Sequence, residues 1–213
     1  MNNDRYIERT HKKIEAVLEL YAAHIFRTVD TAKKVYAYHT TEHLRKPPMV
    51  EEMTEISPNT NWGEEWGNMW LRTSYTVPAE LEGEQLCVIP DANAVEILCF
   101  KNGKPAGIIN SKNQFIGGTH SAMFVEASAK AGSTIDLAFD CYAGHDCLEC
   151  MPYENYDRDE TAPQNFTRLY EGVRIVVLDK VIRDFVFDTA TALQLARLPG
   201  ENFAGMKAHQ CLM

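Results

Sequence analysis

The pattern of apolar and polar positions is most regular in the stretch between Trp62 and Pro78. From Met69 onward the side chains alternate, with Trp70, Arg72, Ser74 and Thr76 on one side and Leu71, Thr73, Tyr75 and Val77 on the other. A period of two, rich in aromatic and β-branched residues and stopped by a proline, predicts a β-strand. Just before it, a corner framed by Gly63 and Gly67 allows backbone turns that bulkier residues resist. We expect the first strand of a β-sandwich here.

Helical periods occur near both ends of the chain. Between Ile7 and Phe26, apolar residues recur at the spacing of one helix face, at Ile14, Val17, Leu18, Tyr21 and Ile25. A second helix is predicted from about Lys180 to Leu198, with Asp179 as its N-cap and Pro199-Gly200 as its end. A further helix should begin after Asn202 and is cut off at Met213. We therefore expect the chain to be part of a longer polypeptide.

Short strands separated by polar turns fill the middle of the chain. Asn102-Gly103 predicts a hairpin, because both positions tolerate positive φ. The predicted strands cover residues 85–90, 94–100, 105–109, 121–127, 135–141 and 168–178. Strands at intervals of about ten residues predict a mainly β fold, an antiparallel sandwich of the jelly-roll, galactose-binding-like kind. N-terminal and C-terminal α-helices should flank it.

The pattern divides the chain into three regions. Residues 1–61 are predicted to form a helix and a wrapping arm, residues 62–178 the β-sandwich and residues 179–213 a helical segment. Two consecutive prolines, Pro47 and Pro48, exclude a helix in the arm and favour an extended path over the surface. The acidic, aromatic stretch 145–166 is predicted to be a long surface loop.

Charge and composition narrow the function classes. The net charge is −9 with a pI near 5.3, and we find no basic stripe, so nucleic-acid binding is not expected. No apolar run approaches the roughly 20 residues of a membrane span. The N-terminus lacks the apolar core of a signal peptide, so a cytoplasmic location is expected. In that compartment the six cysteines should be reduced thiols.

All the tryptophans of the chain lie within nine residues, at Trp62, Trp66 and Trp70. One interpretation is a carbohydrate-binding platform, since aromatic faces pack against the C–H faces of sugar rings. The other is a set of core anchors, because each ring buries a large apolar area. Tryptophan is usually well buried, which favours the second interpretation.

One cluster carries metal-ligand residue types, namely Cys141, His145, Cys147 and Cys150. These four could close a tetrahedral zinc site, although structural zinc sites usually pair two regular Cys-x-x-Cys knuckles. Cys141 should also lie at a strand end, where burial as a small apolar residue explains it. Elsewhere His39 and His43 stand four apart, as metal ligands on a helix would, but no third ligand is near.

Paired carboxylates raise the question of glycoside cleavage, which needs two acidic groups. Glu64 with Glu65, and Asp157 with Asp159 and Glu160, are candidates. Both groups lie in charged, loop-like stretches, which is typical of solvated surface. The motifs G-x-S-x-G, G-x-x-x-x-G-K-[ST], H-E-x-x-H and G-x-G-x-x-G do not occur in the chain. The residues by themselves therefore predict no active site.

Several segments together resemble a known family. These are the run from Trp66-Gly through Trp70-Leu-Arg-Thr-Ser-Tyr-Thr-Val-Pro to Gly83, the hairpin from Ala94 to Pro105, Cys141-Tyr-Ala-Gly144, and the Asp179–Asp188 helix start. In this order they are similar to the N-terminal accessory region of cytosolic-type α-mannosidases of glycoside hydrolase family 38. The resemblance spans nearly the whole chain, most firmly residues 62–109 and 168–198.

The resemblance implies a parent enzyme that is a zinc-dependent retaining α-mannosidase. Its metal is held by a His-x-His-x-Asp segment, which this chain lacks, so no catalytic residue and no cofactor are expected here. Residues 179–213 would then link the sandwich to a downstream catalytic domain. Expected partners are that domain, an oligosaccharide or a second copy of the chain. Two hypotheses follow: a scaffolding or oligomerising accessory region, or a free-standing carbohydrate-binding module.

Overall fold

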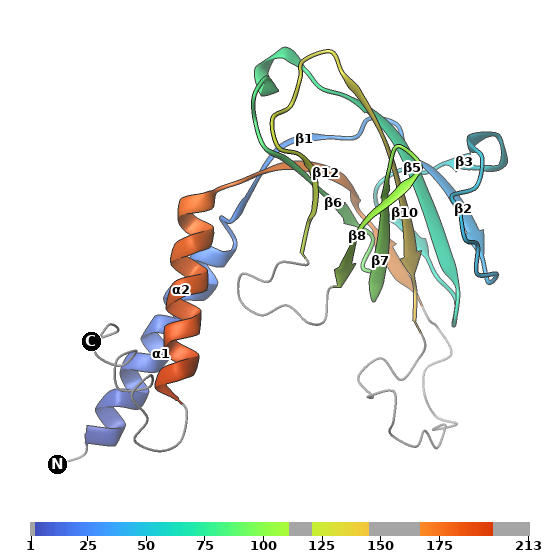
Figure 1. Ribbon diagram of the computed structural model, residues 1–213. Helices are drawn as coiled ribbons and strands as arrows, with labels where there is room; N and C mark the ends of the chain where they lie inside the picture. Colours follow the sequence, from blue (N-terminus) through green and yellow to red (C-terminus); the bar gives the residue numbers. More distant parts are fainter. Residues whose placement is uncertain (1–2, 111–120, 145–166, 198–213) are drawn as a thin grey trace, which may run out of the picture. The chain divides into compact units, whose positions relative to one another are not determined.

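The computed structural model describes residues 3–110, 121–144 and 167–197 (Figure 1). The chain divides into two compact units. The sandwich unit is built from the residues between Thr28 and Val177, and the helical unit from residues up to Arg27 and from Leu178 onward.

The larger sheet of the sandwich has six strands, in the order β3-β2-β5-β10-β7-β8. The long strands β5 and β10 pair antiparallel over their whole length, from Thr76 opposite Thr134 to Asn68 opposite Tyr142. The six strands are β2 (Tyr36–Thr40), β3 (Thr54–Glu55), β5 (Asn68–Thr76), β7 (Glu96–Lys101), β8 (Lys104–Asn110) and β10 (Thr134–Tyr142). Short 3-10 turns stand before β3 and after β5, at η1 (Val50–Glu52) and η2 (Ala79–Leu81).

The remaining strands form two smaller sheets. A four-stranded sheet has the order β1-β12-β6-β9, and β4 pairs with β11 in a two-stranded one. Their bounds are β1 (Phe26–Thr31), β4 (Thr60–Trp62), β6 (Leu86–Asp91), β9 (Met123–Glu126), β11 (Arg168–Tyr170) and β12 (Gly172–Leu178). In Figure 1 the four-stranded sheet lies against the six-stranded one.

The core fills the space between the four-stranded and six-stranded sheets. Alternate side chains along each strand point into it. In β5 the side chains of Leu71 and Tyr75 face this core, as do Leu137 and Phe139 in β10. From the other sheet, β6 and β12 contribute residues such as Val88 and Ile175. One apolar face per strand is what an antiparallel sandwich requires. The predicted mainly β, antiparallel fold with helices at both ends is confirmed.

Turn chemistry fixes the β7–β8 hairpin as predicted. Asn102 and Gly103 have φ values of 50° and 74°, and β7 pairs antiparallel with β8 around them. Two other expectations were wrong. The β5 strand is not the first of the sandwich, because β1 and β2 precede it. The single strand predicted over 168–178 is divided at Gly172, whose φ of 134° favours glycine, into β11 and β12.

The wrapping arm predicted between the first helix and residue 61 is only partly irregular. Strands β1, β2, β3 and β4 lie in or across it, and β2 pairs directly with β5. Between β2 and β3 the chain crosses the outer face of the six-stranded sheet with two bends and the η1 turn, and Leu44 and Met53 pack beside Trp70 there. The Arg72 guanidinium donates a hydrogen bond of 3.0 Å to the Pro48 carbonyl there. We call residues 41–53 the arm from here on.

The helical unit contains α1 (Asn3–Ala22) and α2 (Lys180–Ala196). They run antiparallel, since Arg197 after α2 bonds to Glu15, while Tyr21 contacts Phe185 near the other end. Four buried residues form their common core, namely Leu18, Ile25, Val186 and Leu193. Neither helix is long and apolar enough, in the part that the structure describes, to cross a membrane.

The predicted N-cap of α2 is confirmed. The Asp179 carboxylate accepts a hydrogen bond of 2.9 Å from the Ile182 amide, which otherwise lacks an intrahelical partner. Replacing Asp179 with Ala should lower the free energy of unfolding of the helical unit by about 1 kcal/mol. Far-UV circular dichroism during urea unfolding measures this.

Asp188 provides a control for the cap, because it lies exposed inside the same helix. Asp188→Ala should leave stability unchanged or raise it, since Ala has the higher helix propensity. If both substitutions lowered the free energy of unfolding equally, the capping role of Asp179 would be contradicted.

Candidate functional site

Trp62 is a core residue. It ends β4, its side chain is 4% exposed, and its indole Nε1 donates a hydrogen bond of 2.8 Å to the Ala92 carbonyl. A buried ring with a satisfied N–H has no face to offer to a sugar. This tryptophan ties the two-stranded sheet to the turn after β6.

Trp70 is also buried, on the opposite side of the six-stranded sheet. Its ring is 0% exposed and lies 5.5 Å from the ring of Phe100. The arm covers this face, with Met53 and Leu44 in the same cluster. The outward-facing side of β5 thus forms a second apolar cluster beneath the arm, and Trp70 is its centre.

Trp66 differs from the other two, because its side chain is 53% exposed. It lies in the predicted glycine corner with φ of 64°, and its amide donates a hydrogen bond of 2.7 Å to the Gly144 carbonyl. Gly63 is needed here, since it has φ of 97° and a Cβ would come within 3.2 Å of the Arg168 side chain. The three tryptophans therefore do not form one platform, and of them Trp66 alone keeps an accessible ring.

The metal-ligand cluster is not assembled in the described part of the chain. Cys141 is fully buried between the sheets, and burial raises the pKa of its thiol well above the usual value. His145, Cys147 and Cys150 lie outside the described residues. Across 3–110, 121–144 and 167–197, no group of three or more His, Cys, Asp or Glu is placed to hold a metal ion.

The other candidate residues form no group of three metal ligands in the described part of the chain. His39 lies in β2, so its spacing to His43 is not that of two ligands on a helix. Glu64 and Glu65 belong to the turn around Trp66. Asp157, Asp159 and Glu160 lie outside the described residues.

A half-buried carboxylate lies near the end of β10. Asp140 accepts a hydrogen bond of 2.7 Å from Asn68 Nδ2. Burial raises the pKa of Asp140 above its ordinary value of 3.8, although the hydrogen bond from Asn68 and the charge of His43 act in the opposite direction. Its protonated form is thus favoured by folding.

This shift predicts a pH dependence of stability. Because the folded chain holds the proton to a higher pH than the unfolded chain, the contribution of Asp140 falls as the pH rises above 3.8 through the raised pKa. Asp140→Asn keeps an oxygen for Asn68 but cannot ionise. Its stability relative to wild type should therefore increase between pH 3.8 and neutral pH, measured by urea unfolding at several pH values.

The exposed carboxylate of Asp136, four residues earlier on the same strand, supplies the control. Asp136→Asn should show no comparable increase. A difference in stability between Asp140→Asn and wild type that stays constant with pH would contradict the raised pKa of the half-buried Asp140 carboxyl.

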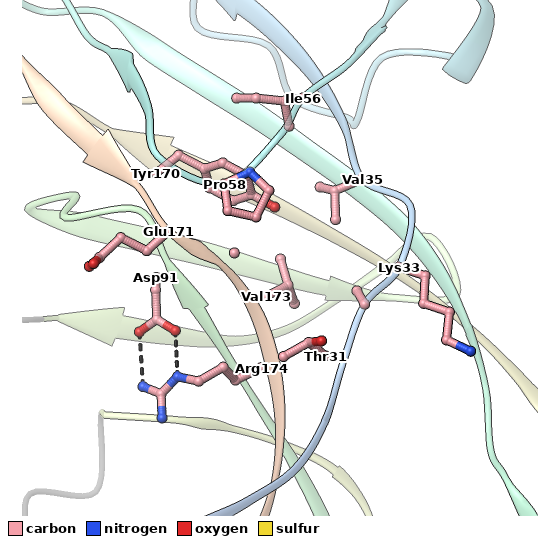
Figure 2. Close-up of a pocket in the computed structure, with 12 residues that line it drawn as sticks. Thr31, Lys33, Val35, Ile56, Pro58, Asp91, Tyr170, Glu171, Val173 and Arg174 are labelled. Carbon is pink, nitrogen blue, oxygen red and sulfur yellow. Dashed lines mark hydrogen bonds and ion pairs between the residues drawn. The ribbon is translucent and has the colours of Figure 1, made fainter.

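A pocket of about 420 Å³ lies where several strand ends meet. Thr31 ends β1, Asp91 ends β6, Tyr170 ends β11 and Gly172 begins β12. The loop before β4 adds Ile56 and Pro58, and the segment after β1 adds Ala32, Lys33 and Val35. Figure 2 shows the aliphatic and aromatic residues around one part of the pocket and a cluster of charged residues around another.

A bidentate ion pair dominates the polar part of the pocket. Arg174 Nε lies 2.5 Å from Asp91 Oδ2, and Nη2 lies 2.9 Å from Oδ1. The third guanidinium nitrogen, Nη1, donates to the Thr28 hydroxyl at 3.2 Å. The hydrogen bonds to Asp91 raise the pKa of Arg174. The main chain holds the same carboxylate residue in place, since the Glu171 amide donates to the Asp91 carbonyl at 2.7 Å.

The floor of the pocket is apolar. Val35, Tyr170 and Val173 line it and are each almost completely buried. Burial raises the pKa of Tyr170 above its ordinary value, so its hydroxyl stays protonated across physiological pH. Above this floor, the more accessible Ile56 and Pro58 can give a small ligand apolar contact, and the rim can give it polar contact.

One side of the helical unit carries an apolar stripe, which we define as Val17 and Tyr21 on α1 with Val181 and Phe185 on α2. Each pair is spaced i, i+4, and the Tyr21 and Phe185 rings meet edge to face at 5.3 Å, so both pairs lie on the same side. Val181 is 80% exposed, and the other three are each more than a third exposed. An apolar stripe of this kind is typical of an interaction surface.

The family comparison identifies the sandwich. A family profile described as "Alpha-mannosidase, jelly roll domain" matches residues 29–170. The match covers most of the chain and nearly all of the sandwich unit. The chain belongs to this α-mannosidase jelly roll family. The resemblance found in the sequence, and the jelly-roll kind of sandwich, are thereby confirmed.

Solved structures similar to this jelly roll chain include β-glucuronidases. One is the enzyme from Ruminococcus gnavus in complex with uronic deoxynojirimycin, with 12% identity and a TM-score of 0.43 over 73% of this chain and 29% of that one. Another, described as Ruminococcus gnavus Beta-glucuronidase, has 11% identity and a TM-score of 0.43 over 73% and 28%. The chain thus spans less than a third of these solved chains. No curated protein matches the sequence significantly.

The pocket of the jelly roll domain was missed from the sequence. Thr31, Asp91 and Arg174 are far apart in the chain, and no local motif joins them. The alternation along β12 could have indicated that Arg174 points away from the core, since Val173 and Ile175 face it. Its pairing with Asp91 depends on the β6–β12 register, which the sequence does not show.

Proposed function

We propose that the chain is the non-catalytic N-terminal region of an α-mannosidase-like glycoside hydrolase, and that it scaffolds the catalytic domain. The observation that carries the proposal is the family match over residues 29–170. Under this proposal the parent protein hydrolyses α-mannosides with zinc bound elsewhere in the polypeptide. A cytoplasmic location and the absence of nucleic-acid and membrane partners belong to the same proposal.

The burial of the tryptophans supports a scaffold over a free-standing sugar-stacking module. The apolar rings of Trp62 and Trp70 are buried inside the domain, and of the three tryptophans Trp66 alone keeps an accessible ring. The buried thiol of Cys141 is likewise explained by packing. These side chains stabilise a framework.

The apolar stripe supports docking to another part of the same polypeptide. It lies on helices outside the residues that match the jelly roll family, so the sandwich itself does not need it. Four exposed apolar side chains at i, i+4 spacing suit a helix or sheet face of a neighbouring domain. A second copy of the chain is the competing occupant and would give a homo-oligomer.

The hydrolytic part of the proposal has a direct assay. The purified chain, supplied with zinc, should not release nitrophenol from an aryl α-mannoside, because the described residues assemble no metal site. Turnover that a chelator abolishes would contradict the proposal. Size-exclusion chromatography with light scattering tests whether a second copy of the chain covers the stripe. A dimer that dissociates in the Val181→Asp variant would show that the stripe serves self-association.

A further inference from the structure

We infer that the pocket in Figure 2 binds a neutral monosaccharide or disaccharide, an activity that goes beyond the proposed scaffold role. The volume of about 420 Å³ falls within the range of small-molecule pockets. The site is separate from the tryptophans, which do not line it.

Charge balance favours a neutral ligand. Two cations, Lys33 and Arg174, and two anions, Asp91 and Glu171, line the pocket. Their formal charges cancel, and the whole chain carries −9, so a phosphate or another anion gains no net attraction. Sugar hydroxyls both donate and accept, and can therefore use donors and carboxylates side by side.

The strongest polar groups are already fixed before any ligand binds. The Arg174 guanidinium donates hydrogen bonds to both carboxylate oxygens of Asp91, and the Glu171 amide donates one to the Asp91 carbonyl. A carboxylate oxygen has more acceptor sites than this pair uses, so it can still receive hydroxyl groups. Groups held in place lose little conformational entropy on binding, which favours a small ligand with few contacts.

The apolar floor complements the C–H faces of a sugar ring. The exposed ring of Pro58 and the half-buried side chain of Ile56 supply its accessible surface, above the buried Val35, Tyr170 and Val173 (Figure 2). A purely apolar ligand would displace water from the charged rim without replacing its hydrogen bonds, which costs free energy. A metal ion is not favoured either, because no group of three ligating side chains is assembled among the described residues. A polyhydroxylated ring satisfies both parts of the pocket.

The experiment is a titration of the isotope-labelled chain followed by ¹H–¹⁵N NMR. The probes are methyl α-mannoside, methyl α-glucoside and methyl β-galactoside, with inorganic phosphate as the anionic comparison. At least one sugar should shift the amide signals of Thr31, Lys33 and Gly172 in a saturable way, and phosphate should not. Glu171→Ala should weaken this binding about tenfold or more, as expected for a lost hydrogen bond to a charged group.

Matched variants keep the test falsifiable. Glu171 and the control residue Glu96 are both exposed, so neither substitution by Ala removes core packing, and Glu96→Ala should bind as wild type. The inference is overturned if none of the sugars shifts the pocket amides, if the shifts centre on Trp66, or if Glu171→Ala binds unchanged. The result is independent of the hydrolysis assay, so failure here leaves the scaffold proposal standing.

Discussion

Replacing Trp70 with Ala should lower the free energy of unfolding of the sandwich by about 3–5 kcal/mol, the range for large aromatic residues in cores. The ring is 0% exposed and packs against Phe100 at 5.5 Å. The arm lies over the cavity that the substitution leaves and is itself held by Met53, so collapse would require moving the arm. Denaturation with guanidinium chloride, followed by circular dichroism, measures the loss.

Trp66 provides the matched control, because it is the same residue type four positions earlier and is 53% exposed. Trp66→Ala should change stability far less than Trp70→Ala. If the two substitutions cost the same, Trp70 is not the centre of a cluster under the arm. A large loss of stability from Trp66→Ala alone would reverse the assignment of core and surface among the tryptophans.

Replacing Leu18 with Ala should destabilise the helical unit by about 2–5 kcal/mol, the range for Leu in a well-packed core. Leu18 is 0% exposed and shares a cluster with Val186 and Leu193 of the other helix. Because the two helices form their own compact unit, the loss should concentrate there. Hydrogen exchange of the α2 amides should accelerate, with little change in β5 and β10.

Leu20 is the control for this second substitution, since it lies on the same helix and is 63% exposed. Leu20→Ala should remain within about 0.5 kcal/mol of wild type. Faster exchange throughout the sandwich in the Leu18 variant would contradict the division into two units.

Elements with a strong local signal could be predicted from the sequence. The alternation after Met69 defines β5, the Asn102-Gly103 pair defines a hairpin, and Asp179 caps α2. Each of these structures depends on residues that are close together in the sequence, so each can be predicted without knowledge of the fold. Burial of Cys141 at a strand end followed from the same reasoning.

Elements that depend on distant partners could not be predicted. β1 is short and mostly polar and β2 has only five residues, so their strand structure depends on pairing with β12 and β5. The pocket has the same origin, since Thr31 and Arg174 meet only through this pairing. The local pattern around the tryptophans does not separate the exposed Trp66 from the two buried rings, because their burial depends on which distant segments cover them.

The central claim is that this chain supports chemistry carried out by another part of its polypeptide. The most direct test is native mass spectrometry of the purified chain mixed with the rest of the natural polypeptide, produced separately. We predict a one-to-one complex that Val181→Asp and Phe185→Asp in the apolar stripe both weaken, while Leu20→Asp outside the defined stripe does so less. A chain that stays uncombined with that remainder, or that hydrolyses α-mannosides alone, would contradict the account.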